Sequence, residues 1–362
     1  MQTKIKTLTT INGSVFDTPS QINVDRSEDI PTCELTFPRR IGSRFRATKK
    51  DCIRVYVGIG SMPTILDTPI FSGYVEHERG YDETILKLIG IQGRCHKEQM
   101  VVDKNNNYDG SEISTVILSV LKSVNELQTA GIIQSKFFIQ ATNPQVKVPK
   151  DTHYDRGTTK WEFIRDLTDM TKDQYNMNTR NYALFVVGDN FYFRKEPRRF
   201  LDAPHIIIPY GSGLIDFEET DEGSDTINRI TVIGKDKVKA TYTNLHRLRT
   251  DGLREGQPIN DDSIKNAGEG YDVARLFVQS RLFDTHSLTI ESLSLLHAIP
   301  GYSLVQLTGA PYGLSGKYIV SGVNINISSS NFYISGELNR HGETISDALS
   351  EALNLNNSIY PR

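Results

Sequence analysis

The sequence has few of the residues that hold small disulfide-bonded or metal-dependent proteins together. Its 362 residues include only three cysteines, Cys33, Cys52 and Cys95, and no Cys-x-x-Cys pair. An odd number of widely spaced cysteines argues against a disulfide framework or a structural zinc site. We therefore expect three buried or half-buried thiols and no metal.

Long apolar runs and an excess of one charge are also missing. No apolar run approaches the roughly 18 residues of a membrane span, and the first residues lack the apolar core of a signal peptide. The 41 basic and 44 acidic residues give a formal net charge of -3. This balance predicts neither a nucleic-acid nor an anionic-membrane partner, although it leaves room for a local patch. We expect folding in the cytoplasm and no stable membrane insertion.

What is present indicates a folded, mainly β protein. Hydrophobic residues make up 38% of the sequence and charged residues 23%, and a chain of this length predicts two or three domains. The first hundred residues alternate between apolar and polar side chains in short stretches, with turn signals such as Asn12-Gly13 between them. We predict a β-sandwich or barrel at 1–100, with strands near 4–8, 32–37, 52–57, 70–75 and 84–91.

Helical spacing begins after a polar loop at 103–110. Apolar residues of 111–127 recur on one stripe, which predicts an amphipathic helix. Thr159 and Glu162 form a capping-box pattern, so a second helix is predicted to begin at Thr159 and to bury Trp161. The run 182–194 predicts a hairpin. Residues 101–205 are thus predicted to form a small mixed α/β domain.

Strand patterns return after Pro204 and predict a second β-domain at 206–340, interrupted by a helix at about 271–283. Residues 341–362 are predicted to form a C-terminal helix and tail. Ile345, Leu349 and Leu353 lie on one apolar stripe of this helix, which packs on its own protein or binds a neighbouring subunit. The predicted fold class is α+β, mostly β.

No segment carries a catalytic or metal-binding constellation. Neither His77 with Glu78 nor His96 with Glu98 has the His-Glu-x-x-His spacing that places two imidazoles on one helix face. The acidic residues between 218 and 225 lack the ligand spacing of a calcium loop. P-loop and Gly-x-Ser-x-Gly motifs are absent from the sequence. We assign no catalytic, cofactor-binding or metal-binding residue and predict no cofactor.

Four stretches resemble the baseplate hub proteins of contractile-tailed phages, especially those of Mu-like phages. The first is the strand 70–75, followed by a strand that ends in Gly93-Arg94. The others are the helix opener 153–167, the block 214–234, which is the most specific match, and the strand 318–323. Their order and spacing are similar to the family's over most of residues 1–340. The loop 243–270 and the C-terminal helix have no counterpart.

The resemblance implies two tail-tube-like β-barrel domains that flank the small α/β domain. It also implies a homotrimer whose pseudo-sixfold ring joins the sixfold tail tube to the trimeric central spike. The implied partners are the tail tube protein, the central spike protein and other baseplate proteins, with DNA able to pass through the channel. The implied location is the baseplate of the virion tail, after assembly in the host cytoplasm, and the implied role is structural and not enzymatic.

Two other functions stay open on the sequence. A tail-tip protein that binds carbohydrates or receptors would need aromatic side chains exposed in a groove, for which Tyr302, Tyr312 and Tyr318 are candidates. A tail-associated cell-wall hydrolase would need two carboxylates that converge in a cleft, one of them with a raised pKa. Any fold can bring two such carboxylates together.

Overall fold

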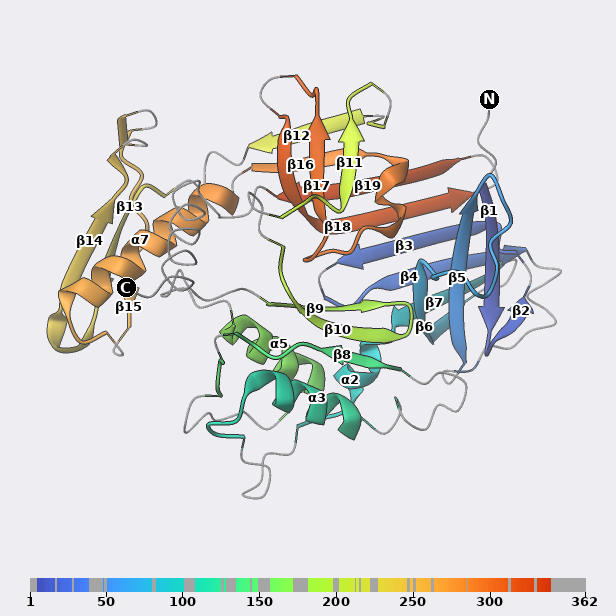
Figure 1. Ribbon diagram of the computed structural model, residues 1–362, viewed down its shortest axis with the longest axis horizontal. Helices are drawn as coiled ribbons and strands as arrows, with labels where there is room; N and C mark the ends of the chain where they lie inside the picture. The colour runs from blue at the N-terminus through green and yellow to red at the C-terminus, as the bar shows by residue number, and fades with distance from the viewer. Residues whose placement is uncertain are drawn as a thin grey trace, which may run out of the picture.

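The structure is a computed structural model. It describes residues 5–16, 18–27, 29–38, 48, 51–79, 83–100, 108–124, 127, 135–143, 145–148, 157–171, 182–197, 202–211, 213–214, 216–221, 227–245, 248–249, 252–261, 264–284, 286–311, 314–328 and 331–339. These residues form a large, mostly antiparallel sheet with a helical unit beside it and a separate arm (Figure 1). The protein is therefore mainly β, as predicted.

Five strands of the N-terminal part lie side by side in the order β3-β4-β7-β6-β5, and every neighbouring pair is antiparallel. We call them the first repeat. β1 pairs with β5, and β2 pairs with β1 through the predicted Asn12-Gly13 turn, in which both residues have positive φ. The bounds of these strands are β1 (Ile5–Ile11), β2 (Ser14–Phe16), β3 (Gln21–Ser27), β4 (Thr32–Pro38), β5 (Cys52–Ile59), β6 (Phe71–Arg79) and β7 (Glu83–Gly90).

Five strands of the C-terminal part, which we call the second repeat, have the same arrangement. Their order is β12-β16-β19-β18-β17, and again every neighbouring pair is antiparallel. β11 adds in parallel to β17. The bounds are β11 (Ile206–Pro209), β12 (Asp216–Asp221), β16 (His286–Glu291), β17 (Leu304–Thr308), β18 (Gly316–Ser328) and β19 (Phe332–Asn339), with a 3-10 helix η2 (Leu293–His297) between β16 and β17.

The two repeats also share an irregularity. The pairing of β6 with β7 shifts register just after Val75, and the pairing of β18 with β19 shifts just after Val320. The last pair before each shift joins two buried aliphatic residues, Val75 with Leu88 and Val320 with Leu338. Strand order, strand direction and bulge position therefore all match, so strands β3–β7 and the strands β12 and β16–β19 are two copies of one structural unit.

One long strand joins the two repeats. After its bulge β18 continues and pairs with β3, in seven antiparallel pairs from Gly322–Ser27 to Ser328–Gln21. Val24 and Ile325 face each other there, and both are 0% exposed. Buried residues of both repeats form one hydrophobic cluster. We call this β3–β18 pairing the internal joint.

The helical unit beside the sheet comes from the segment between the repeats, and we call it the middle unit. The predicted hairpin and both predicted helices are confirmed, including the capping box of Thr159 and Glu162 and the burial of Trp161. β8 adds in parallel to β10. The elements are α2 (Gly93–Lys97), α3 (Ile113–Ser123), β8 (Phe137–Ile139), α5 (Lys160–Met170), β9 (Tyr182–Val187) and β10 (Asn190–Lys195).

A carboxylate caps α3 and fastens a neighbouring loop to it. Glu112 accepts hydrogen bonds from the Thr115 N–H at 3.0 Å and from the N–H and hydroxyl of Thr142 at 3.0 and 2.8 Å. The Ser114 hydroxyl also donates to it. Burial alone would raise the pKa of Glu112, but these hydrogen bonds outweigh burial and lower the pKa to about 2.

Acid is expected to weaken the middle unit between about pH 4.5 and pH 2. Because the folded pKa lies below the ordinary value of 4.5, the ionised cap stabilises the fold above pH 4.5, and this contribution is lost as the pH falls through 2. Glu112→Gln should reduce the pH slope in this window. Urea unfolding followed by fluorescence of Trp161, the only tryptophan, measures it. An unchanged slope in the variant would contradict this role.

A second inserted segment, between β12 and β16, forms the arm at the left of Figure 1. It has its own core, in which Ile230, Val232, Val273 and Val278 are buried. The predicted helix at 271–283 is confirmed but begins earlier, and the predicted loop 243–270 contains β15. The elements are β13 (Arg229–Ile233), η1 (Lys235–Lys237), β14 (Lys239–Thr243), β15 (Ile259–Asn260) and α7 (Ala267–Asp284).

Several predictions need correction. The described strands do not close into barrels, because β3 and β18, one from each predicted barrel, pair with each other and leave one open sheet. The strand expected to end in Gly93-Arg94 ends at Gly90, and Gly93 begins α2. β3 was missed, although its buried Ile22 and Val24 alternate with less buried residues. The predicted domain boundaries stay a prediction.

Candidate assembly surfaces

The two strands of the internal joint, β18 and β3, each have an equivalent in the other repeat, but these two equivalents do not pair with each other. In the second repeat, the part of β18 after the bulge pairs with β3. The corresponding part of the first repeat is the end of β6, residues 77–79, which pairs with β7. The counterpart of β3 is β12, which pairs with β16. Among the residues that the structure describes, both strands keep one free hydrogen-bonding edge, the usual place for strand addition.

The repeat also assigns equivalent residues on these two edges. Asn324 pairs with Asp25 in the internal joint. Arg79 corresponds to Asn324, because each is the third residue of its strand after the bulge in the pairing register. Thr220 corresponds to Asp25, because Thr220 pairs with Ser287 of β16 and Asp25 pairs with Thr32, the equivalent residue of β4.

A largely buried ion pair holds the middle unit against the first repeat. Arg54 of β5 donates from Nη2 to Asp189 Oδ2 at 2.7 Å and from Nε to the same oxygen at 3.0 Å. The two side chains are 16% and 21% exposed. Asp189 lies in the β9–β10 turn after Gly188, whose φ of +59° favours glycine. The hairpin turn therefore presents its carboxylate to β5 in a fixed geometry.

Two further contacts tie the parts together. Asp29, in the β3–β4 turn, accepts a hydrogen bond from Trp161 Nε1 at 2.9 Å and forms an ion pair with Arg165 at 2.8 Å. Arg26 of β3 donates to the carbonyl oxygen of Leu296 in η2 at 2.7 Å. The first of these contacts connects the first repeat with the middle unit, and the second connects it with the second repeat.

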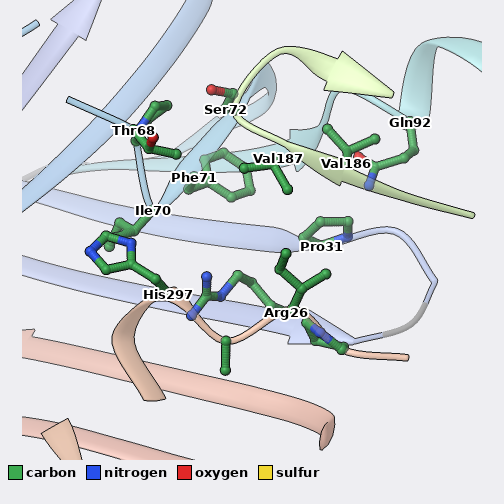
Figure 2. Close-up of a pocket in the computed structure, with 15 residues that line it drawn as sticks. Arg26, Pro31, Thr68, Ile70, Phe71, Ser72, Gln92, Val186, Val187 and His297 are labelled. Carbon is green, nitrogen blue, oxygen red and sulfur yellow. The ribbon is translucent and has the colours of Figure 1, made fainter. Parts of the chain in front are cut away.

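A cavity of about 90 Å³ lies where the three parts meet (Figure 2). Arg26, Gln92, Val186 and His297 come to it from β3, the residue before α2, β9 and η2 (Figure 2). Burial and the nearby Arg26 charge lower the pKa of His297. Arg26 Nε, Ser72 Oγ and Gln92 Oε1 have no hydrogen-bond partner among the described residues, which is typical of a hydrated site. None of the lining residues is a carboxylate, so the cavity lacks the acid pair of a glycosidase.

A loop between β5 and β6 exposes three large apolar side chains, Met62, Ile65 and Leu66, at 53%, 55% and 92%. We call these three residues the apolar tip. The turn beneath them is fixed, because Asp67 Oδ2 accepts the Thr64 N–H at 2.7 Å and the Asp67 N–H donates back to the Thr64 carbonyl at 3.1 Å. The tip is therefore held outward and does not fold back on the protein.

The aromatic residues considered for sugar stacking lie in packed positions where they are described. Tyr318 is 1% exposed. Tyr302 lies between Phe185 and His205, with ring centroids 4.4 and 5.3 Å away. Tyr312 lies outside the described residues. Tyr302 therefore packs between the middle unit and the second repeat, and Tyr318 belongs to the core of the large sheet. Neither ring lines an exposed groove.

The three cysteines are buried and free, as predicted. Burial raises the pKa of Cys52 and of Cys95 to about 12 and that of Cys33 well above its usual range, so these thiols are unreactive at neutral pH. Ile345, Leu349 and Leu353, the predicted partner-binding residues, lie outside the described residues.

The other residues tested for chemistry are dispersed. His77 is exposed on β6, His96 Nδ1 lies 3.3 Å from the Thr159 hydroxyl, and Glu98 pairs with Lys160 at 2.7 Å. In the described part of the chain, no group of three or more His, Cys, Asp and Glu side chains could hold a metal. None of the described helices is long and apolar enough to cross a membrane. The open strand edges and the apolar tip carry no sequence motif, and they are the candidate assembly surfaces of the described residues.

Comparison with known proteins finds similarity in structure alone. No family model and no curated protein sequence matches the chain. A tail protein from Neisseria meningitidis MC58 superposes with a TM-score of 0.66 at 12% identity, over 93% of this chain and 97% of that chain. The 43 kDa tail protein of prophage MuSo2 from Shewanella oneidensis gives 0.62 at 11% identity, over 92% and 98%.

A third similar structure comes from a secretion machine. The E. coli c3393 protein, a type VI secretion system component with structural similarity to the T4 bacteriophage tail proteins gp27 and gp5, superposes with a TM-score of 0.50. The identity is 12%, over 95% of this chain and 76% of that chain. Over nearly its whole length, this chain has the fold of phage tail proteins.

Proposed function

We propose that the chain is a structural, non-enzymatic hub subunit of a contractile-tail baseplate. Three copies form a pseudo-sixfold ring that adapts the sixfold tail tube to the trimeric central spike. The observation that carries this proposal is the structural repeat. β18 pairs with β3 inside the chain, whereas the equivalent strands β6 and β12 do not pair with each other. Three chains of two repeats each supply six similar units.

The open edges suggest how the ring closes. If the end of β6 in one chain pairs with β12 of the next as β18 pairs with β3, Arg79 lies opposite Thr220. β6 and β12 lie seven strand steps apart in the sheet order and do not pair with each other within the chain, so a pairing between them would join different chains. This contact is heterologous, and three such contacts close a cyclic trimer, completing the barrel-like arrangement that one open sheet lacks.

The joint between chains is expected to be weaker than the internal one. β18 offers seven residues after its bulge, whereas β6 reaches only Arg79. Four of the six residues of β12 are acidic, and charged edge strands resist unplanned pairing. Trimer formation should therefore depend on protein concentration and salt, and it should be strengthened by partners.

The remaining roles follow from this arrangement. The tail tube protein, the central spike protein and other baseplate proteins are the proposed partners, with DNA able to pass through the ring. The proposed site of action is the baseplate of the virion tail, after assembly in the host cytoplasm. The C-terminal stripe of Ile345, Leu349 and Leu353 is proposed to dock on a neighbouring subunit.

A cysteine pair tests the ring. In the variant Arg79→Cys/Thr220→Cys, oxidation should link neighbouring chains, because paired strand residues have Cα separations of about 4.5–5.5 Å, within disulfide range. The expected product is a covalent trimer near three times 40.8 kDa, or about 122 kDa, by denaturing electrophoresis. The natural cysteines are buried, so they do not compete.

A matched control is Arg79→Cys/Ser14→Cys, because Ser14 is exposed on β2, which pairs with β1 and not with β6 or β12. Light scattering of the unmodified protein over a concentration series gives the mass of the unlinked ring. A strict monomer or dimer at every concentration, with no covalent trimer and no shift when spike is added, would rule out the ring.

A further inference from the structure

Among the described residues, the apolar tip is present in only one of the two repeats. Its counterpart in the second repeat is the connection 309–315 between β17 and β18. There Leu314 is 4% exposed and Ala310 packs against the core. Residues 309–315 are also fewer than residues 60–70 of the first repeat. In the part of the chain that the structure describes, the tip therefore occurs once and not once per repeat.

The tip and both inserted units leave from the same end of the sheet. The loop 60–70 leads into the start of β6, and Gly73 near that start pairs with Gly90 at the end of β7, where the chain enters the middle unit. The arm follows the end of β12, which corresponds to the end of β3. The end of β3 pairs with the start of β4, and the start of β4 pairs with the end of β7, so all of them lie at this end of the sheet. The end of β6 beside the start of β7, and the end of β18 beside the start of β19, lie at the opposite end, and these strand ends correspond in the two repeats.

These positions give the two faces of the proposed ring different symmetries. A feature that both repeats share occurs six times in a ring of three chains, whereas a feature found once per chain occurs three times. We infer that the end carrying the apolar tip faces the threefold partner, the central spike, and that Met62, Ile65 and Leu66 bind it. This inference rests on the proposed function.

The chemistry of the tip determines the kind of surface that it fits. Three exposed aliphatic side chains lie within five residues, while the polar groups of Thr64 and Asp67 are used within the turn. Exposed apolar clusters on a fixed loop are typical of protein contacts, and a preformed loop loses little entropy on binding. The spike is thus expected to offer an apolar pocket in three copies, and binding at the tip should change little with salt.

The test uses the variant Ile65→Asp/Leu66→Asp of the full chain and the purified spike protein of the same particle as the probe. Because two charges would enter an apolar pocket, binding of spike to the ring is expected to weaken about 100-fold. The control is Val15→Asp. Val15 is 66% exposed on β2 and pairs with Thr10, which pairs in turn with Arg54 near the start of β5, whereas the tip follows the end of β5. This variant should bind spike as the unmodified ring does.

Four outcomes are informative. Weakened spike binding with an unchanged trimer mass and an unaffected Val15→Asp control supports the inference. Unchanged spike binding by the tip variant overturns it while the proposed ring stands. Loss of the trimer in the tip variant also overturns it, since the tip would then belong to the contact between chains. An unmodified chain that never trimerises or binds spike removes the proposed function, and this inference with it.

Discussion

Val24→Asp is expected to destabilise the folded sheet severely. Val24 is fully buried at the centre of the internal joint, opposite Ile325. A carboxylate placed there has no partner, and such burial costs about 4–5 kcal/mol or more. Domains of this kind are stable by only about 5–15 kcal/mol. Because both repeats share one core, we expect them to unfold together, measured by urea unfolding and far-ultraviolet circular dichroism.

Two variants isolate the cause. Val24→Ala removes apolar contacts without adding charge and should cost about 2 kcal/mol. Val15→Asp makes the same chemical change at a residue that is 66% exposed, and it should alter the free energy of unfolding by less than about 0.5 kcal/mol. If Val24→Asp were as stable as Val15→Asp, the internal joint would not be the connection between the repeats.

Arg54→Met should release the middle unit from the first repeat at a cost of about 3 kcal/mol. The substitution leaves Asp189, 21% exposed, without its partner, and breaking a buried pair from one side typically costs about 3–5 kcal/mol. Since Trp161 is the only tryptophan and lies in α5, its fluorescence during urea unfolding reports the middle unit. A loss of this size should lower the transition midpoint clearly.

The double variant Arg54→Met/Asp189→Leu should recover most of the loss, because no charge is then left unpaired. The matched control is Lys87→Met, which breaks the Lys87–Glu34 pair at 3.5 Å, with side chains 46% and 37% exposed. It should cost less than about 1 kcal/mol. Equal losses for Arg54→Met and Lys87→Met would contradict a special role for the Arg54–Asp189 contact.

Local features of the fold could be predicted because their causes are local in the sequence. The Asn12-Gly13 turn, the capping box at Thr159 and the amphipathic stripe of α3 depend on neighbouring residues, and each is confirmed. The odd number and wide spacing of the cysteines predicted free thiols, and all three are free and buried. The resemblance to tail proteins also depended on the order of such local patterns along the chain, which the fold comparison supports.

Other features were beyond the sequence because they join residues far apart in the chain. Arg54 and Asp189 are 135 residues apart, and nothing in either local pattern selects the other as its partner. The structural repeat was also hidden, since few equivalent positions keep their residue, as Val75 and Val320 do, whereas others, such as Tyr74 and Ile319, share only burial. A repeat maintained by strand order and a bulge can persist with scattered identities between its copies.

The open sheet shows most clearly which features the sequence determined and which the tertiary structure decided. The sequence by itself determined that there are two groups of alternating strands around a helical unit, since period-two burial selects strands wherever the chain folds. It did not determine whether each group closes on itself. Only the tertiary structure decided that β18 runs on past its bulge to pair with β3, because strand pairing depends on which edges remain free after folding.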